Sequence, residues 1–447
     1  MQQPKIGNYR WTICSLLFFA TTINYLDRQV LGLLKPVLEK EFNWTETQYG
    51  YIVMSFSASY AIGLVVFGRF IDKIGTKLGY TISITLWSIA AMLHALVKST
   101  FGFGVARAAL GIGESGNFPA AIKTVAEWFP KKERALAAGI LDSGTSIGAC
   151  VAPILVPWIL GWYGWQEAFI ITGAVGFLWL IAWRLLYEIP AKHKKLSKAE
   201  FDYIHSDQDP VAAEGETTKQ TPARPVTPEE AEGDKGKLQW SKLFTYKQTW
   251  AFIVGKFFTD PIWYFFLFWL PSYFSSTFHL DLKKPSLPLV MVYLGATIGA
   301  VGGGYLSYLL IKKGWKVYKS RKFTMFVSAL CVLPIIAARY TTDIWVVVTL
   351  ISLAVAGNAA WSANVYTIVS DMLPKKAVSS VIGIGGLAGA IGGVLFPLAI
   401  GAILDHYKVI GNLVAGYNII FAFCGVSFLL AWLLIHWLTP KMKPAVF

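Results

Sequence analysis

The chain has 447 residues, of which 55% are hydrophobic and only 15% are charged, and its mean hydropathy is +0.51. A soluble domain could not hide so much apolar surface in one core. The formal net charge is +14, but the sequence has no basic patch interleaved with aromatic residues, which argues against nucleic-acid binding. The composition therefore predicts a protein that crosses a lipid bilayer several times.

Apolar runs of about 20 residues, the length needed to cross roughly 30 Å of hydrocarbon, follow one another along the chain. The first run lacks an A-x-A-like cleavage site and is too long for the apolar core of a signal peptide, so we expect an uncleaved helix. Twelve spans are predicted, six in each half, at about 11–34, 48–70, 78–97, 102–126, 135–160, 166–187, 248–274, 286–310, 323–340, 344–369, 378–404 and 413–438.

Basic residues in the short loops predict the orientation. By the positive-inside rule, the side on which they gather is cytoplasmic, and both termini are then expected inside. The residues that share this side are Lys5, Arg10, Arg69, Lys73, Lys77, Lys131, Lys132, Arg134, the run 312–322, Lys375, Lys376, Lys441 and Lys443.

One long polar segment, from about 188 to 245, separates the two groups of six spans. Its part from Val211 to Lys237 is rich in Glu, Thr, Pro, Lys and Gly and cannot bury enough apolar surface to order itself. We therefore expect an N-terminal bundle over residues 1–190, a cytoplasmic linker over 191–245 and a C-terminal bundle over 246–447.

A segment occurs twice, once in each half, 244 positions apart. The run 127–132 (Glu-Trp-Phe-Pro-Lys-Lys) matches 371–376 (Asp-Met-Leu-Pro-Lys-Lys), and Pro153 recurs as Pro397. Several features at one constant shift indicate a duplicated unit. The predicted fold is an all-α membrane protein with twelve transmembrane helices in two pseudo-symmetric six-helix bundles, an arrangement typical of transporters with the substrate between the halves.

Metal and enzyme chemistry find no support in the sequence. The four cysteines have no metal or redox spacing, and none of the six histidines pairs with a cysteine or another histidine at ligand spacing. An enzyme would need a convergent nucleophile and base, and none is visible. We expect no metal, no cofactor and no catalytic residue.

Charged residues inside the spans mark the candidate site, because each costs roughly 2.5–3.5 kcal/mol at the bilayer centre. The first span holds Asp27 and Arg28 side by side, and the fourth holds Arg107 and Glu114 about two turns apart on one face. These four charges could form a structural ion network. Two cations and two carboxylates in one half-bundle favour instead the entry of water and an anion.

The chemistry of these groups predicts a coupling mechanism. A guanidinium binds a carboxylate through paired hydrogen bonds and keeps its proton, so Arg28 and Arg107 suit an anion anchor. When a substrate takes over the arginine, a nearby carboxylate loses a stabilising partner and can gain a proton. Glu114 is the first candidate for this role, and Asp27, which points about 100° away from Arg28, is the second.

Three further charges lie inside spans and leave alternatives open. Asp142, which is followed by Ser143 and Thr145, either lines the substrate path or hydrogen-bonds locally. Lys256 and Asp260 stand four residues apart in the seventh span, a spacing that predicts an intrahelical pair with a structural role.

The repeat offset assigns residues of the second half. A shift of 244 places Glu114 on Asn358 and Asn117 on Trp361, so these two residues are expected to face the substrate from the C-terminal half. A Trp ring offers an apolar face for a sugar and an N–H donor, although aromatic packing would also explain it. Further aromatic candidates are Tyr25, Tyr60, Trp263 and Tyr264.

The loop 68–77 (Gly-Arg-Phe-Ile-Asp-Lys-Ile-Gly-Thr-Lys) resembles the signature loop of the major facilitator superfamily. The resemblance covers the whole chain. It implies a gating role for Arg69 and Asp72, whereas the residues alone also fit a charged turn. The second half departs from the pattern, since Gly304 is followed four residues later by Tyr308 rather than Asp.

Within that superfamily, the runs 24–28 (Asn-Tyr-Leu-Asp-Arg) and 107–119 resemble the anion:cation symporters, and 361–366 (Trp-Ser-Ala-Asn-Val-Tyr) is similar to hexuronate transporters, with galactonate transporters as relatives. This implies a bacterial inner-membrane symporter of protons and a sugar acid, such as galacturonate, glucuronate or a related aldonate, in which the halves rock. Asp142 stands where Asn is more often expected. The resemblance also implies that Arg28 and Arg107 contact the anion and that Asp27 and Glu114 transfer the proton. With the candidates named above and Asn364 of the similar run, the predicted substrate-binding residues are Tyr25, Arg28, Tyr60, Arg107, Asn358, Trp361 and Asn364.

The expected partners are a small anionic substrate, the coupling proton and the lipid bilayer, with the chain acting as a monomer. A carrier or exchanger for another organic anion fits the arginine pair equally well. The residues do not decide between sugar acids, nor between Asp27 and Glu114 as the main proton carrier.

Overall fold

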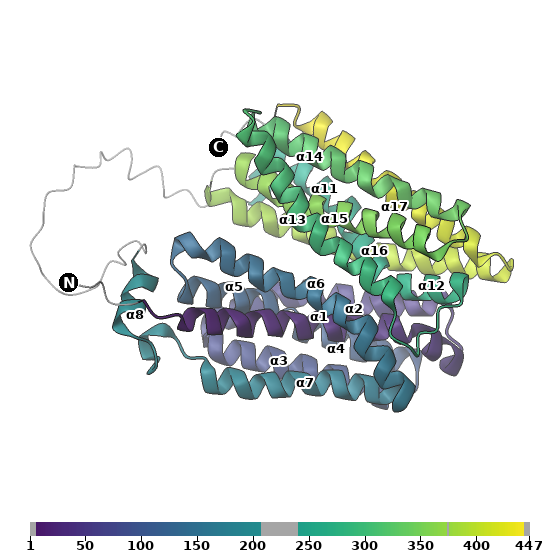
Figure 1. The fold of residues 1–447 in the computed structure, drawn as a ribbon, viewed down its shortest axis with the longest axis horizontal. Helices are drawn as coiled ribbons and strands as arrows, with labels where there is room; N and C mark the ends of the chain where they lie inside the picture. The colour runs from purple at the N-terminus through teal and green to yellow at the C-terminus, as the bar shows by residue number, and fades with distance from the viewer. Residues whose placement is uncertain (1–5, 207–239, 373–374, 442–447) are drawn as a thin grey trace, which may run out of the picture.

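The structure is a computed structural model that describes residues 6–206, 240–372 and 375–441. Over these residues all regular elements are helices. The segment 211–237, which is predicted not to order itself, lies within 207–239, outside the described residues. Figure 1 shows the first half of the chain as one bundle and the second half as another packed along it.

The N-terminal half is built from seven α-helices. They are α1 (Tyr9–Phe42), α2 (Glu46–Ile74), α3 (Thr76–Leu93), α4 (Thr100–Glu114), α5 (Asn117–Trp128), α6 (Lys131–Trp162) and α7 (Trp165–Leu186).

The C-terminal half repeats this pattern after the short helices α8 (Lys198–His205) and α10 (Trp240–Leu243), which lie on either side of the segment 207–239 that the structure does not describe. Its elements are α11 (Lys247–Phe268), α12 (Leu270–Phe278), α13 (Leu287–Lys312), α14 (Val317–Val332) with the 3-10 helix η3 (Leu333–Tyr340), α15 (Ile344–Met372), α16 (Lys375–Val409) and α17 (Leu413–Leu438).

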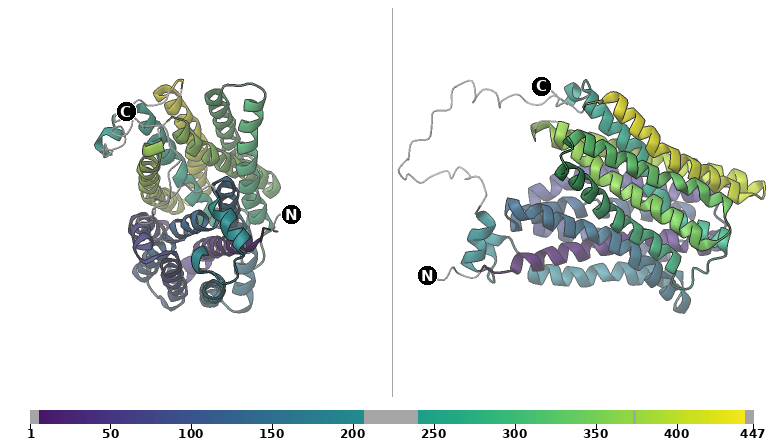
Figure 2. Two further views of the ribbon diagram at one scale, coloured as in Figure 1. Left: turned by 90° about the vertical axis from the view of Figure 1, so that its left-hand side faces the viewer. Right: turned by 45° about the horizontal axis from the view of Figure 1, so that its top comes forward.

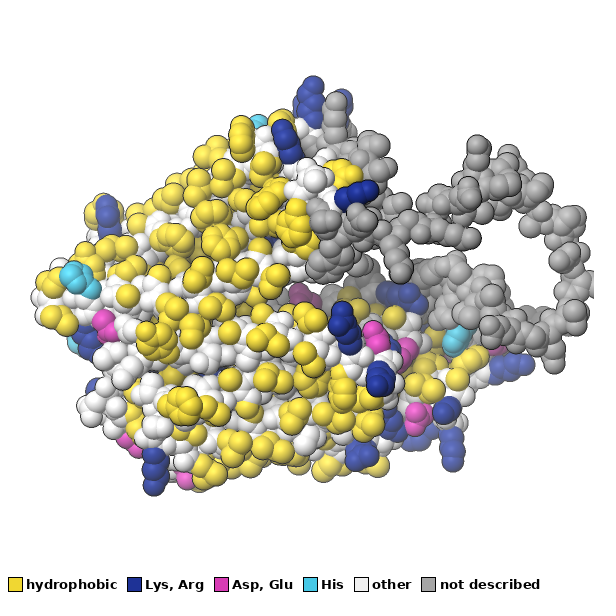
Figure 3. Space-filling model, turned by 180° about the vertical axis from the view of Figure 1, so that it is seen from behind, with side chains coloured by type: hydrophobic (Ala, Val, Ile, Leu, Met, Phe, Trp, Pro, Cys, Tyr) yellow, Lys and Arg dark blue, Asp and Glu magenta, His cyan; other side chains and the backbone are white. Residues whose placement is uncertain are grey.

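Ten helices of the described chain are long and apolar enough to cross a membrane. The other two predicted spans are α1, whose 34 residues include Asp27, Arg28 and Lys35, and the pair α4–α5, which is interrupted at Ser115 and Gly116. The two spans that fall short are thus the ones that carry Arg28 and Glu114, which are both buried. Figure 3 shows the consequence on the surface, where apolar side chains form a broad belt and charged ones gather toward the two ends.

The predicted duplication is confirmed by equivalent helix contacts in the two halves. A Cβ on Gly113 of α4 would lie 2.6 Å from the backbone nitrogen of Trp87 in α3. A Cβ on Gly357 of α15 would lie 2.6 Å from the Ser328 carbonyl and 3.0 Å from Cys331 in α14. Gly113 and Gly357 are 244 positions apart, and so are Trp87 and Cys331. The same close helix crossing therefore occurs once in each half.

The repeated prolines also occupy like positions. Pro153 lies inside α6 and Pro397 inside α16. The backbone oxygen of each contacts the opposite half, since Ser286 donates its N–H to Pro153 at 2.9 Å, and a Cβ on Gly50 would meet the Pro397 oxygen at 2.7 Å. The matching pair Pro130 and Pro374 cannot be compared, because residues 373–374 lie outside the described residues.

The two halves touch at the end of the bundle that lies away from α8 and the termini, which we call the far end; the opposite end is the linker end (Figures 1 and 2). Close backbone contact there depends on glycine. A Cβ on Gly32 of α1 would lie 2.7 Å from the Leu267 oxygen, and one on Gly401 of α16 would lie 2.6 Å from the Glu46 oxygen. A side chain at either position would push the halves apart.

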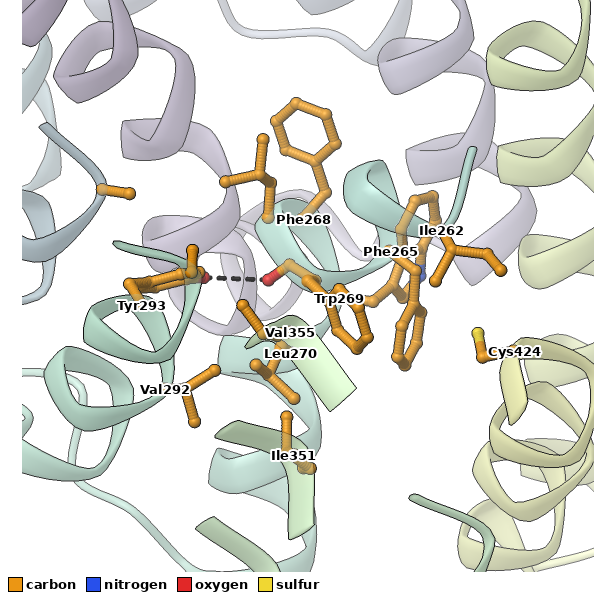
Figure 4. Close-up of a cluster of buried hydrophobic side chains, with 14 of the residues drawn as sticks. Ile262, Phe265, Phe268, Trp269, Leu270, Val292, Tyr293, Ile351, Val355 and Cys424 are labelled. Carbon is orange, nitrogen blue, oxygen red and sulfur yellow. Dashed lines mark hydrogen bonds between the residues drawn. The ribbon is translucent and has the colours of Figure 1, made fainter. Parts of the chain in front are cut away.

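The break between α11 and α12 supports this far-end contact. A helix end leaves backbone carbonyls without partners, and two tyrosines satisfy them here. Tyr49 of α2 donates its hydroxyl to the Phe268 oxygen at 2.9 Å, and Tyr293 of α13 donates to the Phe266 oxygen at 2.8 Å. Figure 4 shows Tyr293 in this bond, in the buried cluster that also contains Trp269. The break is thereby fixed by helices from both halves.

At the linker end, α8 packs against the N-terminal half. The Glu200 carboxylate accepts the backbone N–H of Tyr9 at 3.1 Å and that of Arg10 at 3.0 Å. The Arg10 side chain in turn donates to Glu133 at 2.8 Å. Residues 198–205, which belong to the predicted linker, are thus joined to the starts of α1 and α6.

Candidate functional site

The central feature of the N-terminal half is a buried ion pair between α1 and α4. Arg28 donates from Nε at 2.9 Å and from Nη2 at 2.7 Å, both to Oε2 of Glu114. Arg28 is 3% exposed and Glu114 is 0% exposed. The second oxygen of Glu114 has no hydrogen-bond partner among the described residues. A buried charge pair of this kind is costly to separate unless another ion replaces one partner.

Aromatic rings enclose the Arg28 guanidinium. Its central carbon lies 4.6 Å from the ring centroid of Tyr25 and 4.9 Å from those of Phe56 and Tyr60. Electron-rich ring faces stabilise a cation where water is scarce. Tyr25 and Tyr60 remain half-buried, so the guanidinium is approached past their rings. The predicted residues Tyr25, Arg28 and Tyr60 therefore lie together.

Arg107 lies behind this group rather than beside it. Its Nη2 donates to the backbone oxygen of Arg28 at 2.8 Å, while its Nε and Nη1 have no partner among the described residues. Phe56 and Phe268 cover the guanidinium, with ring centroids at 5.1 and 5.3 Å. Phe268 belongs to the C-terminal half, so closure of the far end buries Arg107 completely.

Asp27 points away from Arg28, as its position on the helix predicts. It is 2% exposed, and neither of its oxygens accepts a hydrogen bond of normal geometry from a described residue. Thr172 of α7 is its polar neighbour, and Glu114 and Arg107 lie within electrostatic range. The four charges predicted to act together are therefore one connected group.

The C-terminal half places a second ion pair in α11. Lys256 lies 2.7 Å from Oδ2 of Asp260 and donates to the hydroxyl of Tyr366 in α15, also at 2.7 Å. The intrahelical pair predicted from the four-residue spacing is confirmed. Tyr264 follows one further turn along the same helix face.

Tyr264 of α11 connects the two ion pairs across the interface. Tyr264 lies within electrostatic range of Arg28 and Tyr60 on one side and of Asp260 and Lys256 on the other. Tyr264, one turn from Asp260, is therefore the residue of this α11 face that lies near Arg28.

The repeat-based residues are placed differently from one another. Asn358 is 8% exposed, and its side chain makes no hydrogen bond to a described residue. Trp361 is 1% exposed, and its ring meets that of Phe428 of α17 edge-on, with the centroids 5.5 Å apart. Of the two roles expected for Trp361, this contact favours aromatic packing over contact with a sugar. Asn364 donates to the oxygens of Gly303 and Ala360 at 3.3 and 2.9 Å. The structure therefore brings neither Trp361 nor Asn364 to Arg28 in this conformation.

Asp142 of α6 is exposed and lies within electrostatic range of Tyr25. Its neighbours hydrogen-bond locally, since Ser143 donates to the Ile140 oxygen at 2.6 Å and Thr145 donates to the Asp142 oxygen at 2.7 Å. The carboxylate itself is thus left available on the face near Tyr25.

The predicted gating residues lie at the linker end of α2. Asp72 pairs with Lys123 of α5 at 2.8 Å, and Arg69 is exposed. Both residues are remote from the Arg28–Glu114 pair along the 29-residue helix. No group of three or more potential metal ligands occurs within the part of the chain that is described.

Two functional neighbours were not predicted from the sequence. Phe56 contacts both guanidinium groups, and Phe268 covers Arg107 from the other half. An aromatic residue in an apolar span carries no signal of its own, because the chain has 29 phenylalanines. A residue of α11 that meets α4 is evident only when the halves are in contact.

Comparisons with known proteins agree with this geometry. Residues 17–397 match the Major Facilitator Superfamily. The hexuronate transporter of Escherichia coli (strain K12) is 31% identical over 443 residues, which cover 99% of this chain and 96% of the relative. The D-galactonate transporter of Escherichia coli O6:H1 is 29% identical over 404 residues, which cover 90% of this chain and 91% of the relative. The crystal structure of a bacterial homolog of the human lysosomal transporter Spinster, inward-facing and unoccupied, has a TM-score of 0.74 at 16% identity and covers 99% of this chain and 100% of that one.

Proposed function

Because the chain belongs to the Major Facilitator Superfamily, we propose that it is a proton-coupled symporter of a sugar acid that works by alternating access. It is a multi-pass membrane transporter, and the resemblance to hexuronate and galactonate transporters is confirmed at 31% and 29% identity. The substrate class and the proton coupling are our proposal. Galacturonate, glucuronate and related aldonates are the candidate substrates.

The observation that carries the proposal is the use of one oxygen of Glu114 by both Arg28 donors, at 2.9 and 2.7 Å. Nε and Nη2 lie side by side on the guanidinium, and this pair of donors could also bind the two oxygens of a substrate carboxylate. An incoming anion competes with Glu114 for the same two donors. A sugar acid supplies that carboxylate and leaves its hydroxyl groups free for the opposite half.

Proton coupling follows from the displacement of Glu114. Once the substrate holds Arg28, Glu114 is a buried carboxylate without its cation, and protonation then relieves the cost of the charge. Asp27 is the second candidate carrier, because it is buried without a normal hydrogen bond. Binding of the anion and of a proton would thereby favour each other.

Alternating access uses the contact between the halves. The structure is closed at the far end, where Phe268 covers Arg107, so we propose that substrate exchanges at the linker end in this conformation. In the opposite conformation Phe268 withdraws, and Arg107 then also reaches the anion. We place the linker end and both termini in the cytoplasm of a bacterial cell, with Arg69 and Asp72 at the gate that closes there.

The test is uptake of labelled galacturonate into proteoliposomes with an imposed pH gradient, acidic on the outside. Accumulation above the external concentration, abolished by a protonophore, supports the proposal. Uptake that never exceeds equilibrium, with exchange intact, would instead identify a carrier or exchanger.

The alternative is that the substrate is an organic anion other than a sugar acid. The Arg28 site supports this alternative too, because it recognises the carboxylate and not the hydroxyl groups of a substrate. Competition by a series of unlabelled acids decides between them. If acids without hydroxyl groups compete as well as galacturonate does, the sugar-acid assignment fails while the anion carrier stands.

A further inference from the structure

The Lys256–Asp260 pair of α11 has no role in the mechanism above, although it is an ion pair inside a span. A charge pair in the membrane interior is costly and marks a functional site more often than a structural one. We define Lys256, Asp260 and Tyr366 as the α11 triad. Lys256 is held by both partners at 2.7 Å and lies 4.4 Å from the Tyr366 ring centroid.

The α11 triad begins a stripe of side chains along one face of the helix. Lys256, Asp260, Tyr264 and Phe268 follow at intervals of four residues. The Tyr264 and Phe268 rings stack with centroids 6.0 Å apart, and Phe268 covers Arg107 at 5.3 Å. Since Tyr264 also lies within electrostatic range of Arg28, the Tyr264 and Phe268 part of the stripe lies opposite the anion anchor.

Glycines of α16 make room for this stripe. A Cβ on Gly389 would collide with Oδ2 of Asp260, and one on Gly393 would lie 2.7 Å from the Tyr264 ring. The side chains of Asp260 and Tyr264 thus pack directly against α16 on one side. The α11 triad is accessible on the side away from α16, because the Asp260 side chain is 30% exposed and Tyr366 is 40% exposed. The Lys256 side chain is only 5% exposed.

We propose that the α11 triad binds the hydroxylated end of the substrate and that Asp260 excludes a second carboxylate from that end. This deepens the proposed function, on which it rests. It assigns the substrate class as a sugar acid with one carboxylate, held by Arg28 at the charged end and by the triad at the other.

The chemistry of the pair supports this choice. Sugar hydroxyls both donate and accept, so one hydroxyl can donate to the Asp260 carboxylate while another accepts from Lys256 or Tyr366. A second carboxylate only accepts and would meet Asp260 with the same charge, and such like-charge contacts are strongly disfavoured. Specificity of this kind needs a repulsive element as well as an attractive one.

Galactonate and galactarate make a matched pair of ligands for the test. They share the configuration of their hydroxyl groups and differ at one end, where galactonate has a hydroxymethyl group and galactarate has a second carboxylate. Their dissociation constants are measured on the purified full-length protein by changes in intrinsic fluorescence or melting temperature, so that the readout does not depend on coupling.

Asp260→Asn leaves Lys256 uncompensated and removes the repulsion. The ratio of galactarate to galactonate affinity should then rise on the order of tenfold or more. Lys256→Gln should move the ratio in the opposite direction, and the double variant should return it toward the wild-type value. The matched control is Glu188→Gln, which breaks the Lys77–Glu188 pair at the linker end and should leave the ratio unchanged.

An unchanged ratio in both folded single variants would overturn the proposal and leave the pair with a structural role. If the charge variants do not fold, Tyr366→Phe decides, since it keeps the ring but loses the hydroxyl. It should weaken galactonate binding several-fold, and unaltered binding overturns the proposal. A wild-type protein that binds neither ligand nor galacturonate would refute the proposed function itself, which is a different result from an unchanged ratio.

Discussion

Asp405 of α16 caps the N-terminus of α2 at Glu46, across the contact between the two halves. Its carboxylate accepts the backbone N–H groups of Glu46 at 2.6 Å and of Thr47 at 2.7 Å. A helix N-terminus carries partial positive charge and unpaired N–H donors, so a carboxylate is favoured there. Nearby, Glu39 of α1 pairs with Lys408 of α16. These contacts hold the far end closed.

Asp405→Ala should open the far end more often. Removal of a cap costs about 0.5–2 kcal/mol, which corresponds to a roughly 2- to 30-fold shift toward conformations open there. Spin labels at the exposed positions Lys40 and Ile410 should report a larger fraction of long distances.

The matched control for this prediction is Asp343→Ala. Asp343 also accepts a backbone N–H at a helix start, that of Trp345 at 2.8 Å, but within one half. It should lower thermal stability without changing the distance distribution. Equal distributions for both variants would show that the Asp405 cap does not hold the halves together.

Arg28→Lys should raise the apparent KM by roughly 10- to 100-fold, because an ammonium lacks the planar pair of donors and a charge-assisted hydrogen bond contributes about 1.5–3 kcal/mol. Arg107→Lys should also weaken uptake, because Arg107 holds the main-chain oxygen of Arg28. Initial rates of labelled galacturonate uptake measure both. Arg10→Lys, at the ion pair with Glu133, is the control and should have a near-normal KM. Near-normal values for Arg28→Lys and Arg107→Lys would make these arginines structural.

Glu114→Gln should abolish accumulation driven by a pH gradient while leaving substrate exchange across the membrane. The amide imitates a permanently protonated acid and cannot carry a proton through the cycle. Uphill uptake and counterflow in the same proteoliposomes separate the two effects. Retained uphill uptake would transfer the proton role to Asp27, for which Asp27→Asn is the companion variant. Loss of exchange as well would make Glu114 a binding or folding residue.

Trp361→Ala should reduce stability more than selectivity. The ring is 1% exposed and packs on Phe428, and loss of such a side chain costs about 3–5 kcal/mol. A lower melting temperature with an unchanged preference among sugar acids is expected.

Asn358→Ala should instead raise the apparent KM with little effect on the melting temperature, since Asn358 makes no hydrogen bond to a described residue. If Trp361→Ala raised the apparent KM and Asn358→Ala lowered the melting temperature, Trp361 would instead be assigned to the substrate site.

The order and number of the spans could be predicted from the sequence because each span is a local property. About 20 apolar residues must form a helix across hydrocarbon, whatever the rest of the chain does. The duplication was also visible, since Pro153 and Pro397 keep their spacing. Arg28 and Glu114 were found for the same local reason, because a charge inside a span is expensive and therefore conspicuous.

Only the tertiary structure decided which charges meet. Arg28 pairs with Glu114, 86 positions away, and Asp405 caps a helix 359 positions away, and no spacing rule predicts such contacts. The same holds for Phe268 over Arg107 and for the α11 stripe opposite Arg28, which exist only where the two halves close on each other. The sequence determined the twelve spans and the cost of their buried charges, whereas the packing of the halves decided which partner compensates each charge.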